Sequence, residues 1–153
     1  MFFAVLVSSL ALAIGIAIYD LVVRELLLAS TNEQSQYAIY ASDSGWECSL
    51  YWDSHYQGTQ SIFPVDSSDP AQSATNAPCA GVDVTFAAVH NVSAPPYATT
   101  TLSFPMGKFY TSIEVGKKKN ADGTVNTIIL SHGYNMAPPF SPRAVERELR
   151  VDY

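Results

Sequence analysis

The first nineteen residues of this 153-residue chain contain no charged side chain, and Asp20 is the first charged residue. Over the whole sequence only 14% of residues are charged, against roughly 25% in an ordinary soluble domain. The deficit is therefore concentrated at one end of the chain. A charge-free opening of this length excludes an ordinary soluble enzyme.

Lysine and arginine are absent from residues 25–107, which contain eight acidic residues. Residues 108–153 hold seven basic and five acidic residues, although the whole chain carries a net charge of −6. This acidic balance disfavours nucleic acid as a partner, because phosphate contacts need Lys and Arg. Two interpretations of the uneven charge remain: a solvated surface without a partner, or acidic and basic faces that meet between copies of the chain.

Motifs for catalysis or metal binding are missing as well. His55, His90 and His132 lie far apart, and none has a second His or an acid at a spacing such as HExxH. The sequence has no nucleophile elbow, phosphate-binding glycine loop or dinucleotide fingerprint. Asp53, Ser54 and His55 are adjacent, and since adjacent residues cannot form a catalytic relay, we expect a surface loop there. We therefore expect no enzyme, no cofactor and no metal.

The uncharged run MFFAVLVSSLALAIGIAIY stands at the start of the chain instead. As a helix it would span roughly 28 Å, close to the roughly 30 Å hydrocarbon core of a bilayer. A cleaved signal peptide would begin with basic residues and end in a polar break, whereas here LVVRELLLAS continues the apolar pattern. We interpret residues 1–28 as a retained transmembrane helix.

This helix is predicted to continue well beyond the apolar run. No proline precedes Pro64, and Asp20 and Arg24 form an i,i+4 pair in the favourable order. The pattern predicts a helix over about residues 1–52, roughly 78 Å long, whose apolar first half protrudes from the domain. Gly15 and Gly45 are either soft points in this helix or tolerated small residues.

The rest of the chain predicts an antiparallel sheet, and the fold class is therefore α+β. Residues 53–105 read as a loop-rich region with a short apolar run and one short strand, and residues 106–153 as the sheet. A hairpin tip at 117–119 explains three consecutive lysines, with a small anion-binding patch as the alternative. The last nine residues favour a strand over a short helix. The amphipathic half-helix 29–52 is expected to pack on the sheet through its aromatic residues: Tyr37, Tyr40, Trp46, Tyr51 and Trp52.

Cys48 and Cys79 are the only cysteines. In a chain whose body lies outside the membrane they would oxidise, and closing that loop would stabilise the fold by roughly 3–4 kcal/mol. Two free buried thiols are the alternative. Asn91 begins an Asn-Val-Ser sequon and is a candidate glycosylation site.

Two segments of the chain carry a resemblance to a known family. The opening FFAVLVSSLALAIGIAIYDLVVRELLLASTNEQSQYAIYASDSGWECSLYWD and the ending ILSHGYN…SPRAVERELRVDY resemble the type IV pilins, more narrowly the pilin-like proteins of candidate-phylum bacteria. The resemblance covers about residues 1–53 and 128–153. It implies a subunit that is cut by a prepilin peptidase, methylated at its new N-terminus, here Met1, and held in the cytoplasmic membrane. Pilus assembly machinery would then polymerise it with other copies of itself into an extracellular filament for adhesion, motility or DNA uptake.

The apolar pattern and the uneven charge indicate which residues would act in such a filament. The filament-core helix would be lined by Phe2, Phe3, Val5, Leu6, Leu10, Leu12, Ile14, Ile16 and Ile18. Candidate inter-subunit charges are Asp20, Arg24, Glu25, Arg143, Arg147 and Arg150.

Val5 departs from the family pattern, because most members carry a glutamate at the fifth mature position. The resemblance implies that this glutamate would pair with the N-terminal amine of a neighbouring subunit. Its absence leaves open a mature terminus other than Met1, an amine that is solvated or otherwise paired, or a minor tip subunit. A different class of function also remains: a single-pass, membrane-anchored ectodomain that binds a surface ligand, such as a cell-wall glycan, as a monomer.

Overall fold

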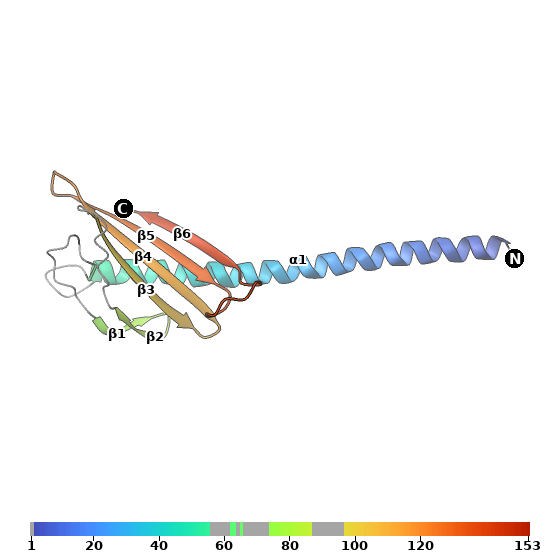
Figure 1. Cartoon of the computed structure of the whole chain (residues 1–153), viewed down its shortest axis with the longest axis horizontal. Helices are drawn as coiled ribbons and strands as arrows, with labels where there is room; N and C mark the ends of the chain where they lie inside the picture. Colours follow the sequence, from blue (N-terminus) through green and yellow to red (C-terminus); the bar gives the residue numbers. More distant parts are fainter. Residues whose placement is uncertain (1, 56–61, 64, 66–73, 87–96) are drawn as a thin grey trace. The chain divides into compact units, whose positions relative to one another are not determined.

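The structure is a computed structural model that describes residues 2–55, 62–63, 65, 74–86 and 97–153. Its elements are the helix α1 (Phe2–His55) and the strands β1 (Ala74–Cys79), β2 (Val82–Phe86), β3 (Tyr97–Met106), β4 (Phe109–Lys119), β5 (Val125–Tyr134) and β6 (Glu146–Asp152) (Figure 1). The predicted α+β class, with one long N-terminal helix and a small antiparallel sheet, is confirmed. The chain divides into two compact units, residues 1–34 and 35–153, and we call the second unit the head.

The first unit is the N-terminal part of α1. Every described side chain of residues 2–22 is exposed. The hydroxyls of Ser8 and Ser9 donate hydrogen bonds to the carbonyls of Val5 and Leu6 one turn earlier, at 3.0 and 2.9 Å. Because their hydrogen bonds are made within the helix, these two serines add little polarity to the apolar surface.

The head is built on a four-stranded antiparallel sheet in the order β3-β4-β5-β6. Its inward face follows the alternation of the sequence: Thr111, Ile113 and Val115 on β4 are buried, and so is Ile129 on β5. The predicted hairpin and the strand at the C-terminus are therefore confirmed, with the short-helix alternative excluded for residues 146–152.

The prediction that residues 53–105 are mainly loop is wrong for much of its described part. β1 and β2 form a separate two-stranded ribbon, and β3 runs ten residues as a full member of the sheet. The segment ATNAPC of β1 has no run of β-branched residues, so local propensity gives no strand signal. It is held instead by pairing with β2 and by Cys79 at its end.

The fully buried residues of α1 are small ones. The buried residues of α1 are Ala38, Ala41, Ser42, Gly45, Cys48 and Ser49. Tyr40 and Tyr51 remain 64% and 52% exposed, so the predicted aromatic packing face is wrong for these two. Trp46 and Trp52 are partly buried against the apolar core, as the prediction expected. Tyr37 does meet the sheet region, stacking on Phe109 with ring centroids 4.8 Å apart.

Two glycines explain why this face must be small. A Cβ at Gly133 of β5 would run into the backbone of Ala38 and Ser42 and lie 2.9 Å from the carbonyl carbon of Ala41. A Cβ at Gly45 of α1 would clash with Ser131 and lie 2.5 Å from the Thr111 hydroxyl. Gly45 is therefore a packing requirement, neither a soft point nor a merely tolerated residue.

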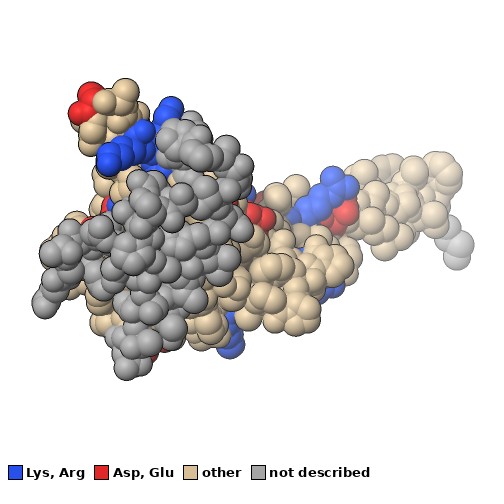
Figure 2. Space-filling model, turned by 60° about the vertical axis from the view of Figure 1, so that its left-hand side comes forward, with Lys and Arg blue, Asp and Glu red and all other residues tan. Residues whose placement is uncertain are grey.

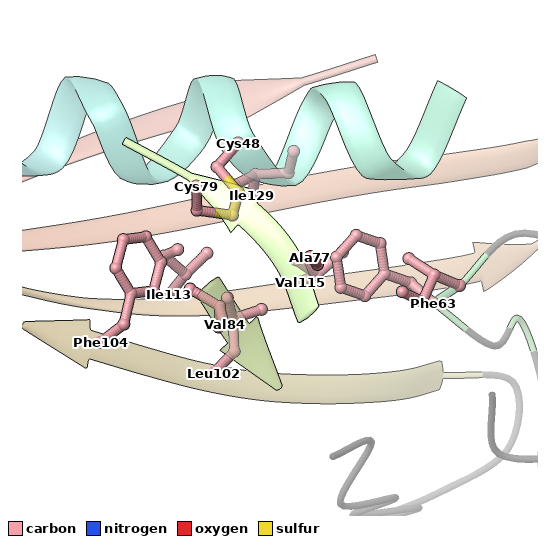
Figure 3. Close-up of a cluster of buried hydrophobic side chains, with 11 residues drawn as sticks. Cys48, Phe63, Ala77, Cys79, Val84, Leu102, Phe104, Ile113, Val115 and Ile129 are labelled. Atoms are coloured by element: carbon pink, nitrogen blue, oxygen red, sulfur yellow. A yellow bond between two sulfur atoms is a disulfide. The ribbon is translucent and has the colours of Figure 1, made fainter. Parts of the chain in front are cut away.

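The apolar core lies between the head portion of α1, the sheet and the β1–β2 ribbon (Figure 3). Its largest fully buried side chains are Phe63, Ile62, Ile113, Ile129 and Val115. The predicted disulfide between Cys48 and Cys79 is present, with Cα atoms 5.5 Å apart. It joins α1 to the end of β1.

Replacing Cys48 and Cys79 together with serine is expected to lower the free energy of unfolding by about 3–4 kcal/mol, because the bond closes a loop of 31 residues in the unfolded chain. Guanidinium denaturation of the full chain in detergent measures this. Reductant should bring the wild type to the stability of the variant and leave the variant unchanged. Equal stabilities of variant and oxidised wild type would contradict a stabilising bond.

Candidate membrane helix and surfaces of the head

Residues 2–28 of α1, which we call the apolar segment, form the largest candidate functional feature. The helix contains a stretch long and apolar enough to cross a membrane, and none of that stretch is buried. The predicted filament-core residues are all exposed: Phe2, Phe3, Val5, Leu6, Leu10, Leu12, Ile14, Ile16 and Ile18. In Figure 2 this part of the helix is almost wholly tan, with a single group of charged atoms. The segment can therefore anchor the chain in a membrane.

The charged residues of the apolar segment pair locally. Arg24 lies 3.0 Å from Asp20 across one helical turn, and both side chains are mostly exposed. Glu25 is exposed as well. An exposed pair of this kind contributes at most about 0.5 kcal/mol to helix stability. No described atom outside the neighbouring helix backbone lies within 4 Å of a Cβ built on Gly15, so its small size relieves no crowding within the described chain.

A buried ionic cluster joins the end of α1 to the sheet. The Lys117 ammonium contacts one carboxylate oxygen of Asp53, and both side chains are more than nine-tenths buried. The Tyr153 hydroxyl donates to the other carboxylate oxygen at 2.7 Å. Two predictions are corrected here: Lys117 belongs to β4, not to a solvated hairpin tip, and Asp53 belongs to α1, not to a surface loop.

Burial raises the pKa of Tyr153 above its ordinary value of 10.0, and its hydrogen bond to the Asp53 carboxylate raises it further. The folded chain thus favours the protonated phenol. This contribution to stability is fully present below pH 10 and is lost as the pH rises above that value. The backbone of Tyr153 also pairs with that of Thr127 in both directions, at 2.7 and 3.0 Å.

Ser54 and His55 come within hydrogen-bonding distance, yet their surroundings differ from those of a catalytic relay. The Ser54 hydroxyl lies 2.8 Å from Nδ1 of His55, but it also reaches the carbonyls of Leu50 and Tyr51, at 2.9 and 3.1 Å. The carboxylate of Asp53 is directed to Lys117 and Tyr153. The histidine ring stacks on Tyr51, with centroids 4.5 Å apart.

His132 has acidic neighbours that the sequence spacing did not indicate. On the face of the sheet away from α1, its Nδ1 lies 2.7 Å from Glu146 and 3.7 Å from Glu148 of β6. The pairing of β5 with β6 brings His132 to Glu146, fourteen positions later in the sequence, and to Glu148. Among the described residues, no group of three or more His, Cys, Asp or Glu side chains has the geometry to hold a metal ion.

The three candidate arginines of the head have different surroundings. Nε of Arg147 donates to the Ser35 hydroxyl at 2.8 Å, and Arg150 pairs with Asp152 at 3.1 Å. Arg143 is exposed in the β5–β6 connection, and no described residue forms an ion pair with its guanidinium. Its backbone is fixed nonetheless, because the Arg143 amide donates to the Ser141 hydroxyl at 3.2 Å.

A shallow groove lies beside the disulfide and has a cavity volume of about 460 Å³. We call it the disulfide groove, and its lining residues are Ser44, Glu47, Cys48, Tyr51, Pro78, Cys79 and Ala80. The sequence analysis missed it, because the side chains come from α1 and from the end of β1 and the turn after it, which lie far apart in the sequence. The candidate glycosylation site Asn91 and His90 lie outside the described residues.

Comparison of the chain with protein-family models, with curated proteins and with solved structures finds no match in any of the three. The geometry of the chain and the physical chemistry of its surfaces therefore carry the functional argument.

Proposed function

We propose that this chain is a structural subunit of an extracellular type IV pilus-like filament. The observation that carries the proposal is the exposed apolar surface of residues 2–22, which is continuous in one helix with a disulfide-bonded head. A globular protein does not leave such a surface in water, so a membrane or other protein must cover it. In this proposal both do so, one after the other.

The apolar composition of the segment suits both a membrane and a filament core of packed helices. Each buried large apolar side chain contributes about 1.5–3 kcal/mol relative to water. Extraction from the cytoplasmic membrane would therefore need assembly machinery, and the polymer of packed helices would be durable. Contacts between two different patches of identical subunits produce an open helical array instead of a closed ring. A prepilin peptidase would prepare the N-terminus before assembly.

A minor tip subunit is the second candidate, and Val5 favours it. The early acid of one subunit would pair with the terminal amine of the subunit ahead of it. A subunit at the tip has no subunit ahead of it, so it does not need that acid. The membrane-anchored ectodomain that acts as a monomer shares the same apolar segment and differs in never leaving the membrane.

The location of the chain in its own cells tests these alternatives. We expect sheared surface filaments, seen by electron microscopy, to contain this chain as their main component, labelled along their length by an antibody against the head. Mass spectrometry of those filaments should find a processed, N-methylated terminus. Label at filament ends alone would replace the main-subunit assignment with the tip subunit. An unprocessed chain confined to the membrane fraction would overturn the filament proposal.

Replacing Arg143, Arg147 and Arg150 together with glutamate is expected to weaken assembly. The acidic residues of another copy would then face negative charges instead of positive ones. Like charges brought together at an interface cost several kcal/mol. Filament yield, measured by immunoblot of the sheared fraction against the membrane fraction, reports the effect. The matched control reverses Lys108, Lys118 and Lys119, the same number of charges elsewhere on the head. Unchanged yield in the arginine variant would count against electrostatic pairing.

A further inference from the structure

The disulfide groove has the chemistry to accept a cationic side chain. Glu47 contributes an exposed carboxylate. The ring of Tyr51 stacks on His55 but is 52% exposed, and its exposed part gives an aromatic surface for a guanidinium. Pro78 and Ala80 line the opposite side with apolar atoms, against which the methylene stem of an arginine can pack. A carboxylate, an aromatic ring and an apolar wall together match arginine better than lysine.

The charged residues that flank the groove in the chain are acidic. Asp83 of β2 is exposed and pairs in register with Pro78 of the groove. Asp43 lies on α1 one turn before Glu47. No lysine or arginine occurs anywhere in residues 25–107, which include every residue that lines the groove. An approaching cation is therefore attracted and meets no competing positive charge from these residues.

Arg143 is the cation on the head that best fits this groove. It is exposed in the β5–β6 connection, whereas Arg147 and Arg150 already bond to Ser35 and Asp152. The connection is held in shape by Asn135, whose side-chain oxygen accepts a hydrogen bond from the Val145 amide at 2.8 Å. Arg143 is thus presented from an ordered turn, which lowers the entropy lost when it binds.

The groove and Arg143 lie at different ends of the head. The strand that follows Arg143 is tied to α1 at Ser35 by Arg147, and Glu47 comes twelve residues later in the same helix, about 18 Å along its axis. A single head therefore does not fill its own groove with Arg143. One head can place Arg143 in the groove of another, and the second head then leaves its own Arg143 available to a third.

We propose that Arg143 of one copy docks in the disulfide groove of the next copy, with its guanidinium on Glu47 and Tyr51. This inference rests on the proposed filament and names the contact between neighbouring heads. The contact joins two different surfaces, so it continues along an open polymer. The occupant is a second copy of this chain, because the cation and its groove belong to the same molecule and their charges are complementary.

A charge swap tests the contact in cells that express the full chain. Glu47→Arg and Arg143→Glu should each lower filament yield by about tenfold, since like charges then meet at the interface. The combination of both substitutions should restore most of the yield, because the pair is re-formed with its charges exchanged. Glu114→Arg and Lys119→Glu are the matched controls, since both residues are exposed on β4 away from the groove. They should leave the yield unchanged.

The possible outcomes separate this inference from the proposed function. If the wild type forms filaments and the single variants also assemble normally, the docking contact is overturned and the filament proposal stands. Single variants that fail without rescue by the swap would also overturn it. A wild type that forms no filaments would overturn the filament proposal itself. Equal amounts of each variant in the membrane fraction, with equal melting temperatures in detergent, exclude loss of folding as the cause.

Zero-length cross-linking gives a direct measurement of the same contact. In Arg143→Lys filaments, carbodiimide should join the new amine to Glu47, and mass spectrometry should find the linked peptides. Mixed filaments of isotopically light and heavy chains should contain light–heavy pairs, which identify a link between copies. Links within single chains alone, or no link at Glu47, would contradict the proposed docking.

Discussion

Gly133→Ala is expected to lower the free energy of unfolding of the head by about 3 kcal/mol or more. The added methyl would be placed against the backbone of Ala38 and Ser42, which cannot rotate away as the end of a side chain can. The helix would have to move off β5, and this would also break the 2.7 Å hydrogen bond from the Ser131 hydroxyl to the Ser42 carbonyl. Guanidinium denaturation of the full chain, followed by tryptophan fluorescence, measures the change.

Gly116→Ala is the matched control for this prediction. Gly116 lies on β4, beside β5, and a Cβ there would come no closer than 3.9 Å to its nearest neighbour, the Ile128 carbonyl oxygen. Alanine is also the better residue in a strand, so we expect a change within about 0.5 kcal/mol, on the stabilising side. If the two variants proved equally stable, the close contact between α1 and β5 would be refuted.

Asp53→Ala is expected to destabilise the chain by about 3–5 kcal/mol, because it leaves the ammonium of Lys117 buried without its carboxylate. The hydroxyl of Tyr153 loses its acceptor in the same variant. Lys117→Met should cost less, since Asp53 keeps the hydrogen bond from Tyr153. Thermal unfolding of the full chain in detergent compares the two.

The combined variant Asp53→Leu with Lys117→Met distinguishes a charge effect from a packing effect. Replacing a buried ion pair by apolar residues of similar volume is often close to neutral, so the double variant should be more stable than Asp53→Ala. Tyr153→Phe removes only the hydroxyl and should cost about 1 kcal/mol. A double variant as unstable as Asp53→Ala would show that the cluster contributes through shape instead of charge.

Those parts of the fold that depend on local pattern could be predicted from the sequence. The absence of proline before Pro64 and the helical spacing of apolar residues indicated the long helix, which ends at His55, three residues beyond its predicted end. The alternation in residues 109–115 gave the hairpin, which β4 and β5 confirm. β1 was missed because its residues, ATNAPC, have low strand propensity, and pairing with β2 decides its conformation. β3 was expected only as a short strand, and its full length of ten residues follows from pairing with β4.

The surfaces of the head could be predicted less well, because they depend on which side chains long-range packing brings together. The aromatic residues of α1 gave the stronger signal, yet Ala38, Ser42 and Gly45 meet the sheet, since the backbones approach too closely for rings. Small residues at i, i+4 and i+7 were visible in the sequence and could have indicated this approach. Nothing local linked Asp53 to Lys117, which lie 64 positions apart.

The order β3-β4-β5-β6 leaves β6 with one neighbour in the described sheet, β5, and thus an edge whose backbone groups could pair with another chain. Five of its seven residues are charged, in the sequence ERELRVD. Charged side chains along an edge strand discourage it from adding a further strand. The charged edge therefore works against amyloid-like stacking of sheets from neighbouring copies. Growth of the proposed polymer is then left to the helix and to the surfaces of the head.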